Sequence, residues 1–204
     1  MQGDAAREAA ARWDDRYRTG DTPWDTGLVS QELLNFLDRG IVSGGHAVEL
    51  GCGTGTNALE LSRRGFRVTA ADCSAVALKQ ARSAASSVHN IEFFEADVRV
   101  WEPDFGPCDF VFDRGCYHCV RRTDLDGYLR TLQRIARPGT HVLLLAGNDR
   151  EVWENGPPTV SEDEIRDEFA AVCDRIAIRE FHFEDAGGQS GPLGWSCHFV
   201  WRAS

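Results

Sequence analysis

The chain has 204 residues, with 22 Lys and Arg against 32 Asp and Glu and a formal net charge of -10. Its length fits a single domain with a sizeable core, and its acidic balance argues against a nucleic-acid partner, because phosphate binding needs a basic face. The seven cysteines are an odd number, and neither an apolar signal run nor an apolar stretch of membrane length is present. These features predict a reduced, cytoplasmic protein without membrane association.

The first 40 residues predict two helices with a loop between them. Residues 4–18 are rich in alanine and charged side chains, which favours a helix, and residues 30–40 show helical apolar spacing before a terminating glycine. The loop, TGDTPWDTG at residues 19–27, is full of turn formers. We expect residues 1–40 to form a helical lid that belongs to the same domain as the core, residues 41–204.

From residue 46 onward, segments with strand character alternate with segments of helical character. The predicted strands are residues 46–50, 66–72, 91–97, 108–113, 140–147, 176–184 and 194–202. The predicted helices are residues 56–64, 74–87, 123–136 and 161–172. This alternation predicts a Rossmann-like α/β domain with a seven-stranded, mostly parallel sheet covered by helices on both faces. The last two strands are expected to pair antiparallel, and the glycine-rich connection between them is expected to be mobile.

The first strand of this series ends in Glu49, and Gly51, Gly53 and Gly55 follow at alternate positions. A strand, a glycine turn and a helix in this order form the usual place for a nucleotide-like ligand. The spacing G-x-G-x-G differs from the G-x-G-x-x-G of dinucleotide folds, and the lysine-containing P-loop pattern is absent. An NAD enzyme and a plain helix-packing turn are the alternative interpretations.

Two acids lie at the tips of the next two strands. Asp72 ends the second strand about 20 residues after the first glycine of the turn, where a carboxylate can accept from both hydroxyls of a ribose. Asp97 ends the third strand, and Val98 follows it. The carboxylate of Asp97 suits the amino edge of an adenine, and the apolar side chain of Val98 suits the face of its ring. Cys73 follows Asp72 at the same edge of the sheet, and Glu49 and the glycine turn can bind the ammonium and carboxylate of an amino acid. A ligand with ribose, adenine and an amino-acid end is S-adenosylmethionine, which is therefore the predicted cofactor.

The stretch VELGCGTGTNALELSRRGFRVTAADCSAVAL, followed by FFEADV, resembles the class I S-adenosylmethionine-dependent methyltransferases over about residues 45–145. A second stretch, WDDRYRTGDTPWDTG, together with CDFVFDRGCYHCV, resembles the thiopurine, thiol and halide methyltransferase group. This resemblance implies that an N-terminal helix and loop fold over the cofactor. It also implies that Trp13, Tyr17 and Trp24 cover the cofactor, and that Arg114 of the D-R-G motif lies near the acceptor.

The aromatic residues also have an explanation in their chemistry. The sulfonium of S-adenosylmethionine is a cation, and cations bind well over the faces of Trp and Tyr. Trp13 and Tyr17 are four residues apart on one predicted helix face, so they fit core anchors equally well. For Trp24, which lies in the loop, the role of cofactor lid is the favoured interpretation.

The end of the fourth strand carries the richest polar cluster of the chain: Asp113, Arg114, Tyr117 and His118. Ligands of open parallel sheets bind beyond the carboxyl ends of the strands, so this cluster is predicted to serve catalysis. A cation such as Arg114 favours the thiolate form of a thiol acceptor, and Tyr117 or His118 can relay the proton. In the alternative interpretation Arg114 is a structural clamp, paired with Asp113 or another carboxylate, and His118 lies at the edge of the core.

Cys116 and Cys119 form a C-x-x-C pattern around His118. A zinc site would need a second matched pair of ligands, so no metal is predicted. In the methyltransferase group that the chain resembles, the region after the fifth strand closes the acceptor pocket, which implies that Trp153, Asn155 and Pro157 shape an aromatic or heterocyclic substrate site.

The sequence therefore predicts a monomeric S-adenosylmethionine-dependent methyltransferase that transfers a methyl group to a small-molecule thiol. Methylation of a halide, oxygen, nitrogen or metalloid acceptor is the first alternative. A cofactor-binding module without catalysis is the second alternative, and the polar cluster on the acceptor side counts against it.

Overall fold

The computed structural model describes residues 2–151, 156–185 and 190–202. The strands in this part of the chain are β1 (Gly45–Leu50), β2 (Phe66–Asp72), β3 (Ile91–Glu95), β4 (Phe110–Arg114), β5 (His141–Asn148), β6 (Thr159–Val160), β7 (Cys173–Glu184) and β8 (Ser190–Trp201). The helices are α1 (Gln2–Thr19), α2 (Gln31–Asp38), α3 (Thr56–Arg63), α4 (Ala75–Ala84), α5 (Cys116–Ile135) and α6 (Glu162–Phe169).

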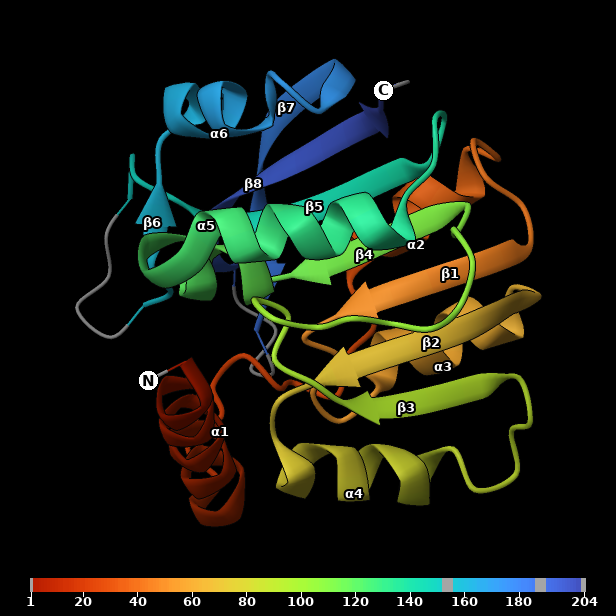
Figure 1. Cartoon of the computed structure of the whole chain (residues 1–204), viewed down its shortest axis with the longest axis vertical. Coiled ribbons are helices and arrows are strands. Elements are labelled where there is room, and N and C mark those ends of the chain that lie inside the picture. Colours follow the sequence, from red (N-terminus) through yellow and green to blue (C-terminus); the bar gives the residue numbers. More distant parts are fainter. Residues whose placement is uncertain (1, 152–155, 186–189, 203–204) are drawn as a thin grey trace.

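The strands form one mixed sheet in the order β3-β2-β1-β4-β5-β8-β7, with β6 beside β5 (Figure 1). Strands β1 to β5 pair parallel with one another, while β8 pairs antiparallel with both β5 and β7. The α/β fold and its mostly parallel sheet are thus confirmed. The predicted count of seven strands misses β6, because a two-residue strand is too short to show any alternation of side chains.

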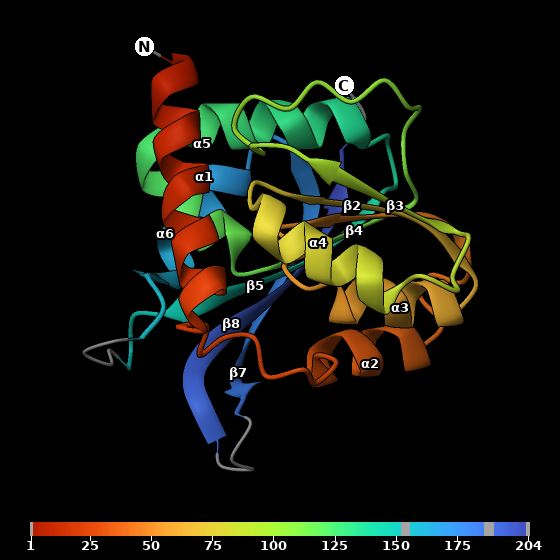
Figure 2. The same cartoon turned by 90° about the horizontal axis from the view of Figure 1, so that it is seen from below.

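Two hydrophobic layers enclose the sheet. On one face α5 and α6 pack their apolar side chains, among them Tyr128, Leu132 and Phe169, against β1, β4, β5 and β8. On the other face α2, α3 and α4 contribute Leu33, Leu61 and related residues. Figure 2 shows the sheet edge-on between α5 and the group of α2, α3 and α4. Because both faces are covered, β1, β4 and β5 are buried except at one terminal residue each, as in other parallel sheets.

Helix α1 lies beside the carboxyl ends of β1 to β4, near the start of α4 (Figure 1). The Asp14 carboxylate accepts from the Ser74 hydroxyl, at 2.7 Å, and from the backbone N–H of Val76, at 3.1 Å. The N-terminal helix is therefore tied to the edge of the sheet where ligands of this fold class bind.

The α5 helix begins at Cys116, well before the predicted start at residue 123. No helix was predicted for this polar stretch, whereas the structure makes it the first turns of α5. A non-helical residue, Asp124, with φ of -159° and ψ of 76°, interrupts the helix. This difference decides where the side chains of the D-R-G-C-Y-H cluster point.

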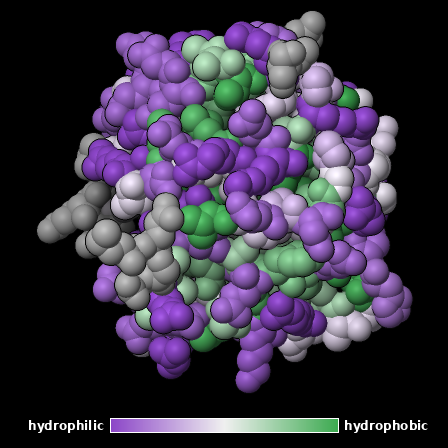
Figure 3. Space-filling model, viewed as in Figure 1, coloured by the Kyte–Doolittle hydropathy of each residue, from purple (hydrophilic) through white to green (hydrophobic). Residues whose placement is uncertain are grey.

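The surface seen in Figure 3 is mostly hydrophilic, with small hydrophobic areas between the charged side chains. None of the described helices combines the length and the apolar character that a membrane crossing requires. The predicted mobile connection between the last two strands covers residues 185–194. Residues 190–194 of it belong to β8 instead, so the connection is shorter than predicted, and residues 186–189 lie outside the described residues.

Candidate active site

The glycine turn after β1 brings three elements into contact. Gly51 and Gly53 have φ values of 69° and 52°, in the region that favours glycine. A Cβ on Gly51 would lie 2.7 Å from the Cβ of Cys116, and one on Gly53 would lie 2.6 Å from the hydroxyl of Tyr17. The turn therefore needs glycine for backbone conformation and for space, because α5 and α1 approach it directly.

Asp72 holds this turn to the start of α4. Its Oδ2 accepts from the backbone N–H of Gly53 and its Oδ1 from that of Ser74, both at 2.8 Å. Burial raises the pKa of the carboxyl. A carboxylate has about four acceptor positions, so Asp72 retains capacity for further donors such as ribose hydroxyls.

Glu49 is the buried acid at the end of β1, with 2% of its surface exposed. The Asn57 amide donates to its Oε1 at 3.5 Å, while Oε2 is buried and has no hydrogen-bond partner among the described residues. Burial, reinforced by the nearby Asp72 charge, raises the pKa of the Glu49 carboxyl to about 8. Buried polar atoms are normally paired, so this oxygen beside the glycine turn fits a cationic group of a ligand such as the ammonium of S-adenosylmethionine.

The expected adenine site lies at the end of β3 and carries a partner that the sequence analysis missed. Nε of Arg99 donates to both oxygens of Asp97, at 2.9 and 3.1 Å. Although burial opposes it, this ion pair lowers the pKa of Asp97. Val98 is buried in the core on the α5 face. Cys73 lies near Asp72 and Asp97, and burial with these charges raises the pKa of its thiol to about 12.

The aromatic residues of the N-terminal segment form one cluster. Trp13 and Trp24 meet edge to face with ring centres 5.3 Å apart, and the indole N–H of Trp24 donates to the Tyr17 hydroxyl at 3.2 Å. The Arg16 guanidinium lies over the Trp24 ring at 4.2 Å. Thr54 in the glycine turn donates to Asp25 at 2.9 Å. Trp24 is thus attached, through its neighbours, to the turn expected to hold the cofactor.

Asp113 is fully buried, and its carboxylate accepts hydrogen bonds from the first residues of α5. Its Oδ1 accepts from the backbone N–H of Cys116 at 2.9 Å, and its Oδ2 accepts from the Tyr117 N–H at 3.0 Å and from the Tyr128 hydroxyl at 2.8 Å. Burial raises its pKa to about 7. These contacts satisfy N–H groups that a helix start leaves unpaired, so the geometry indicates a helix-capping role in place of the expected catalytic one.

Tyr117 points away from the cofactor turn and into the core. Its ring packs against Tyr128 and Phe169, at centroid distances of 5.6 and 5.4 Å, and its hydroxyl donates to Glu168 of α6. The expected proton relay by Tyr117 does not agree with this position. The physical reason is the early start of α5, which turns the residue after Cys116 inward.

His118 is also buried, and its ring is held by the backbone of β5. The N–H of Gly147 donates to Nδ1 at 2.8 Å, which places the proton of the neutral ring on Nε2. Burial and the nearby Arg114 cation lower the pKa of His118 to about 3. A histidine in this state is a poor base near neutral pH, in contrast to the role expected from its ordinary pKa.

Arg114 at the end of β4 connects the loop at residues 19–27, the expected lid loop, to the end of β7. Its Nη1 donates to the carbonyl of Trp24 at 3.1 Å, and its Nη2 donates to Oε2 of Glu184 at 3.0 Å. The guanidinium lies over the ring of Phe183 at 5.3 Å. Nε of Arg114 is buried without a hydrogen-bond partner among the described residues. The clamp considered from the sequence therefore exists, with Glu184 as its carboxylate and not Asp113.

Glu184 was not singled out by the sequence analysis, because it lies 70 residues from Arg114 and no motif connects them. Trp153 and Asn155, expected near the acceptor, lie outside the described residues. Among the described residues no group of His, Cys, Asp and Glu is arranged to hold a metal ion, and the prediction that the protein uses no metal stays a prediction.

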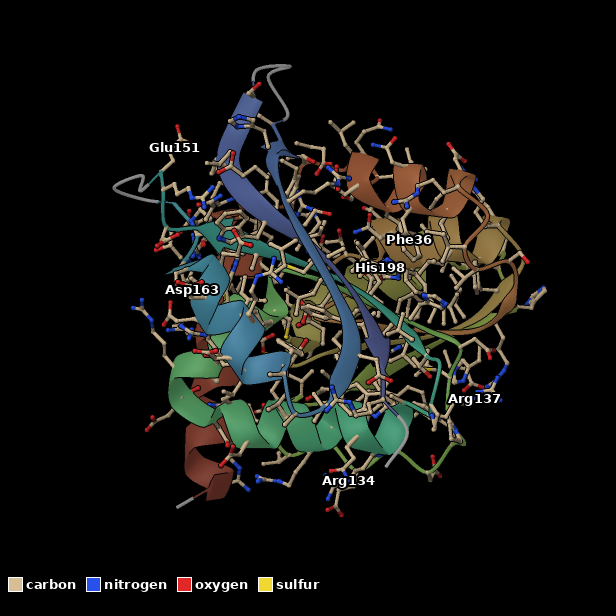
Figure 4. The ribbon with its side chains drawn as sticks, turned by 90° about the horizontal axis from the view of Figure 1, so that it is seen from above. Phe36, Arg134, Arg137, Glu151, Asp163 and His198 are labelled. Carbon is tan, nitrogen blue, oxygen red and sulfur yellow. The ribbon has the colours of Figure 1, made fainter. Side chains whose placement is uncertain are left out.

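Two surface hollows lie away from this site. One, of about 410 Å³, is at the amino ends of the strands and includes Arg137. The other, of about 220 Å³, is between α2 and the β7–β8 pair and includes Phe36 and His198, which meet there in Figure 4. Neither hollow contains the glycine turn or the residues at the carboxyl end of β4.

The chain is similar in sequence to known methyltransferases. Residues 8–191 match the family model described as Thiopurine S-methyltransferase (TPMT). A 2-heptyl-1-hydroxyquinolin-4(1H)-one methyltransferase of Mycobacteroides abscessus is 27% identical over 92% of this chain and 83% of its own length. A probable thiol methyltransferase 2 of Arabidopsis thaliana is 24% identical over 78% of this chain and 72% of its own.

Solved structures give the same result for the fold. A structure described under the conversion of a disulfide bond into a thioacetal group during echinomycin biosynthesis matches with a TM-score of 0.79 and 26% identity, covering 95% of this chain and 91% of that one. A SAM-dependent methyltransferase from Aquifex aeolicus matches with a TM-score of 0.69 and 18% identity over 92% of this chain and 98% of that one.

Proposed function

We propose that this chain, which belongs to the thiopurine S-methyltransferase family and is an S-adenosylmethionine-dependent methyltransferase, transfers the methyl group to a small-molecule thiol. The observation that carries the proposal is the chemistry at the carboxyl end of β4. Arg114 lies there with 12% of its side chain exposed, and its buried Nε has no hydrogen-bond partner among the described residues. Beside it is a histidine that is held neutral. Among the described residues this part of the site therefore offers a cation, while its histidine is a poor base near neutral pH and its Asp113 carboxylate is engaged by the start of α5.

A site with a cation and a weak base suits an acceptor that loses its proton to water before methyl transfer, because the cation then stabilises the anion. A free thiol has a pKa of about 8.5, and a nearby positive charge lowers it, so Arg114 can stabilise a thiolate without a proton-accepting side chain. Alcohols lose their proton far less readily and would need a base at the site. In-line displacement then depends on alignment, which can contribute roughly 7–11 kcal/mol.

The cofactor supplies the activated methyl group, and the residues described above supply its binding. In this proposal Glu49 binds the ammonium, and Gly51 and Gly53 give room for the amino-acid end. Asp72 accepts from the ribose, and Cys73, Asp97 and Val98 border the adenine. Trp13 and Trp24 belong to the lid that excludes water from the methyl group. Oε2 of Glu49, which is buried and has no hydrogen-bond partner in the described part of the chain, supports the first assignment.

Names of relatives support a sulfur acceptor, since one is a probable thiol methyltransferase and another a thiocyanate methyltransferase of Brassica oleracea. A second candidate function is O-methylation of an N-hydroxylated heteroaromatic compound. The quinolone methyltransferase of Mycobacteroides abscessus favours it, because its match covers 92% of this chain. An N-hydroxyl is more acidic than an alcohol, so the same cation would serve this acceptor.

The test is a competition between acceptor classes. Purified protein is incubated with S-adenosylmethionine and equimolar aryl thiols, alkyl thiols, a 1-hydroxyquinolin-4-one, thiocyanate, iodide and phenols, and methylated products are identified by mass spectrometry. The proposal expects thioethers to dominate. Preferential methylation of the N-hydroxyl would select the second candidate, and turnover of phenols alone would contradict both.

A further inference from the structure

Glu184, the last residue of β7, makes two different connections with its two carboxylate oxygens. Oε1 accepts from the backbone N–H of Gln31 at 2.6 Å and from the hydroxyl of Ser30 at 3.3 Å. Oε2 accepts from Nη2 of Arg114 at 3.0 Å. The side chains of Glu184 and Arg114 are each only 12% exposed, so this ion pair is largely screened from water.

The first connection replaces a local helix cap. Ser30 is the N-cap residue of α2, yet its side chain makes no capping hydrogen bond to its own helix. The Glu184 carboxylate accepts from the first N–H of α2 instead, where a negative charge is favourable. The start of α2, which directly follows the lid loop, is thereby attached to the tip of β7.

The second connection fixes the plane of the Arg114 guanidinium. Nη2 donates to Glu184, Nη1 donates to the carbonyl of Trp24, and the ring of Phe183 lies beside the planar group. With both terminal nitrogens engaged by the protein, Nε is the nitrogen left without a protein acceptor among the described residues. A guanidinium held at two nitrogens directs its remaining N–H in one direction, as its rigid fork requires.

We propose that Glu184 is a positioning residue of the methyl transfer: it holds Arg114 so that Nε–H faces the acceptor anion, and through Ser30 and Gln31 it ties this orientation to the start of α2. The inference rests on the proposed function, because it assigns the acceptor to Arg114. It goes beyond that function in naming a residue on β7 that never touches the acceptor and on which the rate nevertheless depends.

The main variant is Glu184→Gln, which keeps one acceptor oxygen for the Gln31 N–H and removes the charge that pairs with Arg114. The matched control is Glu32→Gln, because Glu32 also connects α2 to β7, through an ion pair with Arg179, and does not contact Arg114. Calorimetric binding of S-adenosylhomocysteine and thermal unfolding establish that each variant is folded. Steady-state rates use the acceptor that the wild-type enzyme methylates best.

For Glu184→Gln we expect a loss of at least about tenfold in kcat/KM for the acceptor, since small misplacements of a catalytic group have effects of this size. The dissociation constant of S-adenosylhomocysteine should stay within about twofold of wild type, because Glu184 has no contact with the glycine turn. Glu32→Gln should retain its rate. Glu184→Asp, which keeps the charge, should recover part of the activity.

A double-mutant comparison separates positioning from general support of the fold. If Glu184 acts through Arg114, then Glu184→Gln should cause little further loss in an Arg114→Ala background. Equal losses in both backgrounds, or a wild-type rate for Glu184→Gln, would overturn the inference while leaving thiol methylation intact. A wild-type protein that methylates no member of the acceptor panel would instead contradict the proposed function, and the role of Glu184 with it.

Discussion

Glu49 provides a prediction in which stability and cofactor binding change in opposite directions. The perturbation is Glu49→Gln, which removes a carboxyl whose pKa is raised from 4.5 to about 8 by burial. A group with a raised folded-state pKa binds its proton more tightly in the folded protein. The ligand-free protein therefore loses stability as the pH rises from about 4.5 to about 8.

The size of this loss follows from the shift. Each pKa unit corresponds to about 1.4 kcal/mol, so the change from 4.5 to about 8 amounts to about 5 kcal/mol at pH 8 and above. The glutamine variant cannot ionise and should be more stable than wild type by an amount approaching this value at high pH. Near pH 4 the difference should vanish. Urea unfolding at both pH values measures it.

Cofactor binding should show the opposite preference. An ammonium beside Oε2 favours the ionised carboxylate, so binding should expel the proton, about 0.9 proton per cofactor at pH 7 for a group that titrates near pH 8. The affinity of the wild-type protein should then rise about tenfold from pH 6 to pH 7. Glu49→Gln should bind weakly and without this slope.

Titration calorimetry in two buffers of different ionisation enthalpy reports the expelled proton directly. Equal heats in both buffers, with a dissociation constant independent of pH, would show that Glu49 does not face the cofactor ammonium. The reasoning would also be refuted if the glutamine variant were less stable than wild type at pH 8.

Three further predictions concern neighbouring parts of the site. Asp72→Ala should weaken S-adenosylmethionine binding at least tenfold in calorimetric titration, since charge-assisted hydrogen bonds contribute roughly 1.5–3 kcal/mol; an unchanged dissociation constant would remove the ribose assignment. Residues 20–30 should exchange their amide hydrogens more slowly once cofactor is bound, and identical exchange with and without it would contradict the lid. Tyr117→Phe should lower the unfolding free energy by about 1 kcal/mol through loss of the bond to Glu168, with kcat unchanged, whereas a large fall in kcat at normal stability would restore Tyr117 as a proton relay.

The fold was predictable where periodicity and glycine chemistry act locally. Strands β1 and β2 are apolar runs flanked by turn residues. The turn after β1 was predictable from its glycines, because glycine readily adopts the positive φ values found there. The antiparallel pair β7–β8 was predictable from alternation alone. These features depend on a few consecutive residues, so one sequence is enough to show them.

The roles at the end of β4 were not predictable in the same way. The stretch after Arg114 is polar and no helix was predicted there, but Asp113 caps a helix through N–H groups only three and four residues ahead. The partners that decide the positions of Tyr117 and Arg114 are Glu168 and Glu184, which lie 51 and 70 residues away. Pairings at this distance are set by how helices and strands pack together, which local patterns in a single sequence do not reveal.

The central claim is that the acceptor ionises by itself beside the Arg114 cation, with no base from the enzyme. The most direct measurement is kcat/KM against pH for two aryl thiols whose own pKa values differ by about 2 units, since kcat/KM reports groups of the free enzyme and free substrate. The account predicts that the rising limb of kcat/KM moves with the thiol and lies near its pKa. It also predicts that Arg114→Ala loses less of kcat, which reports the bound thiol, at a pH above that value. A rising limb at one fixed pH for both thiols would reveal a titrating enzyme base and contradict the account.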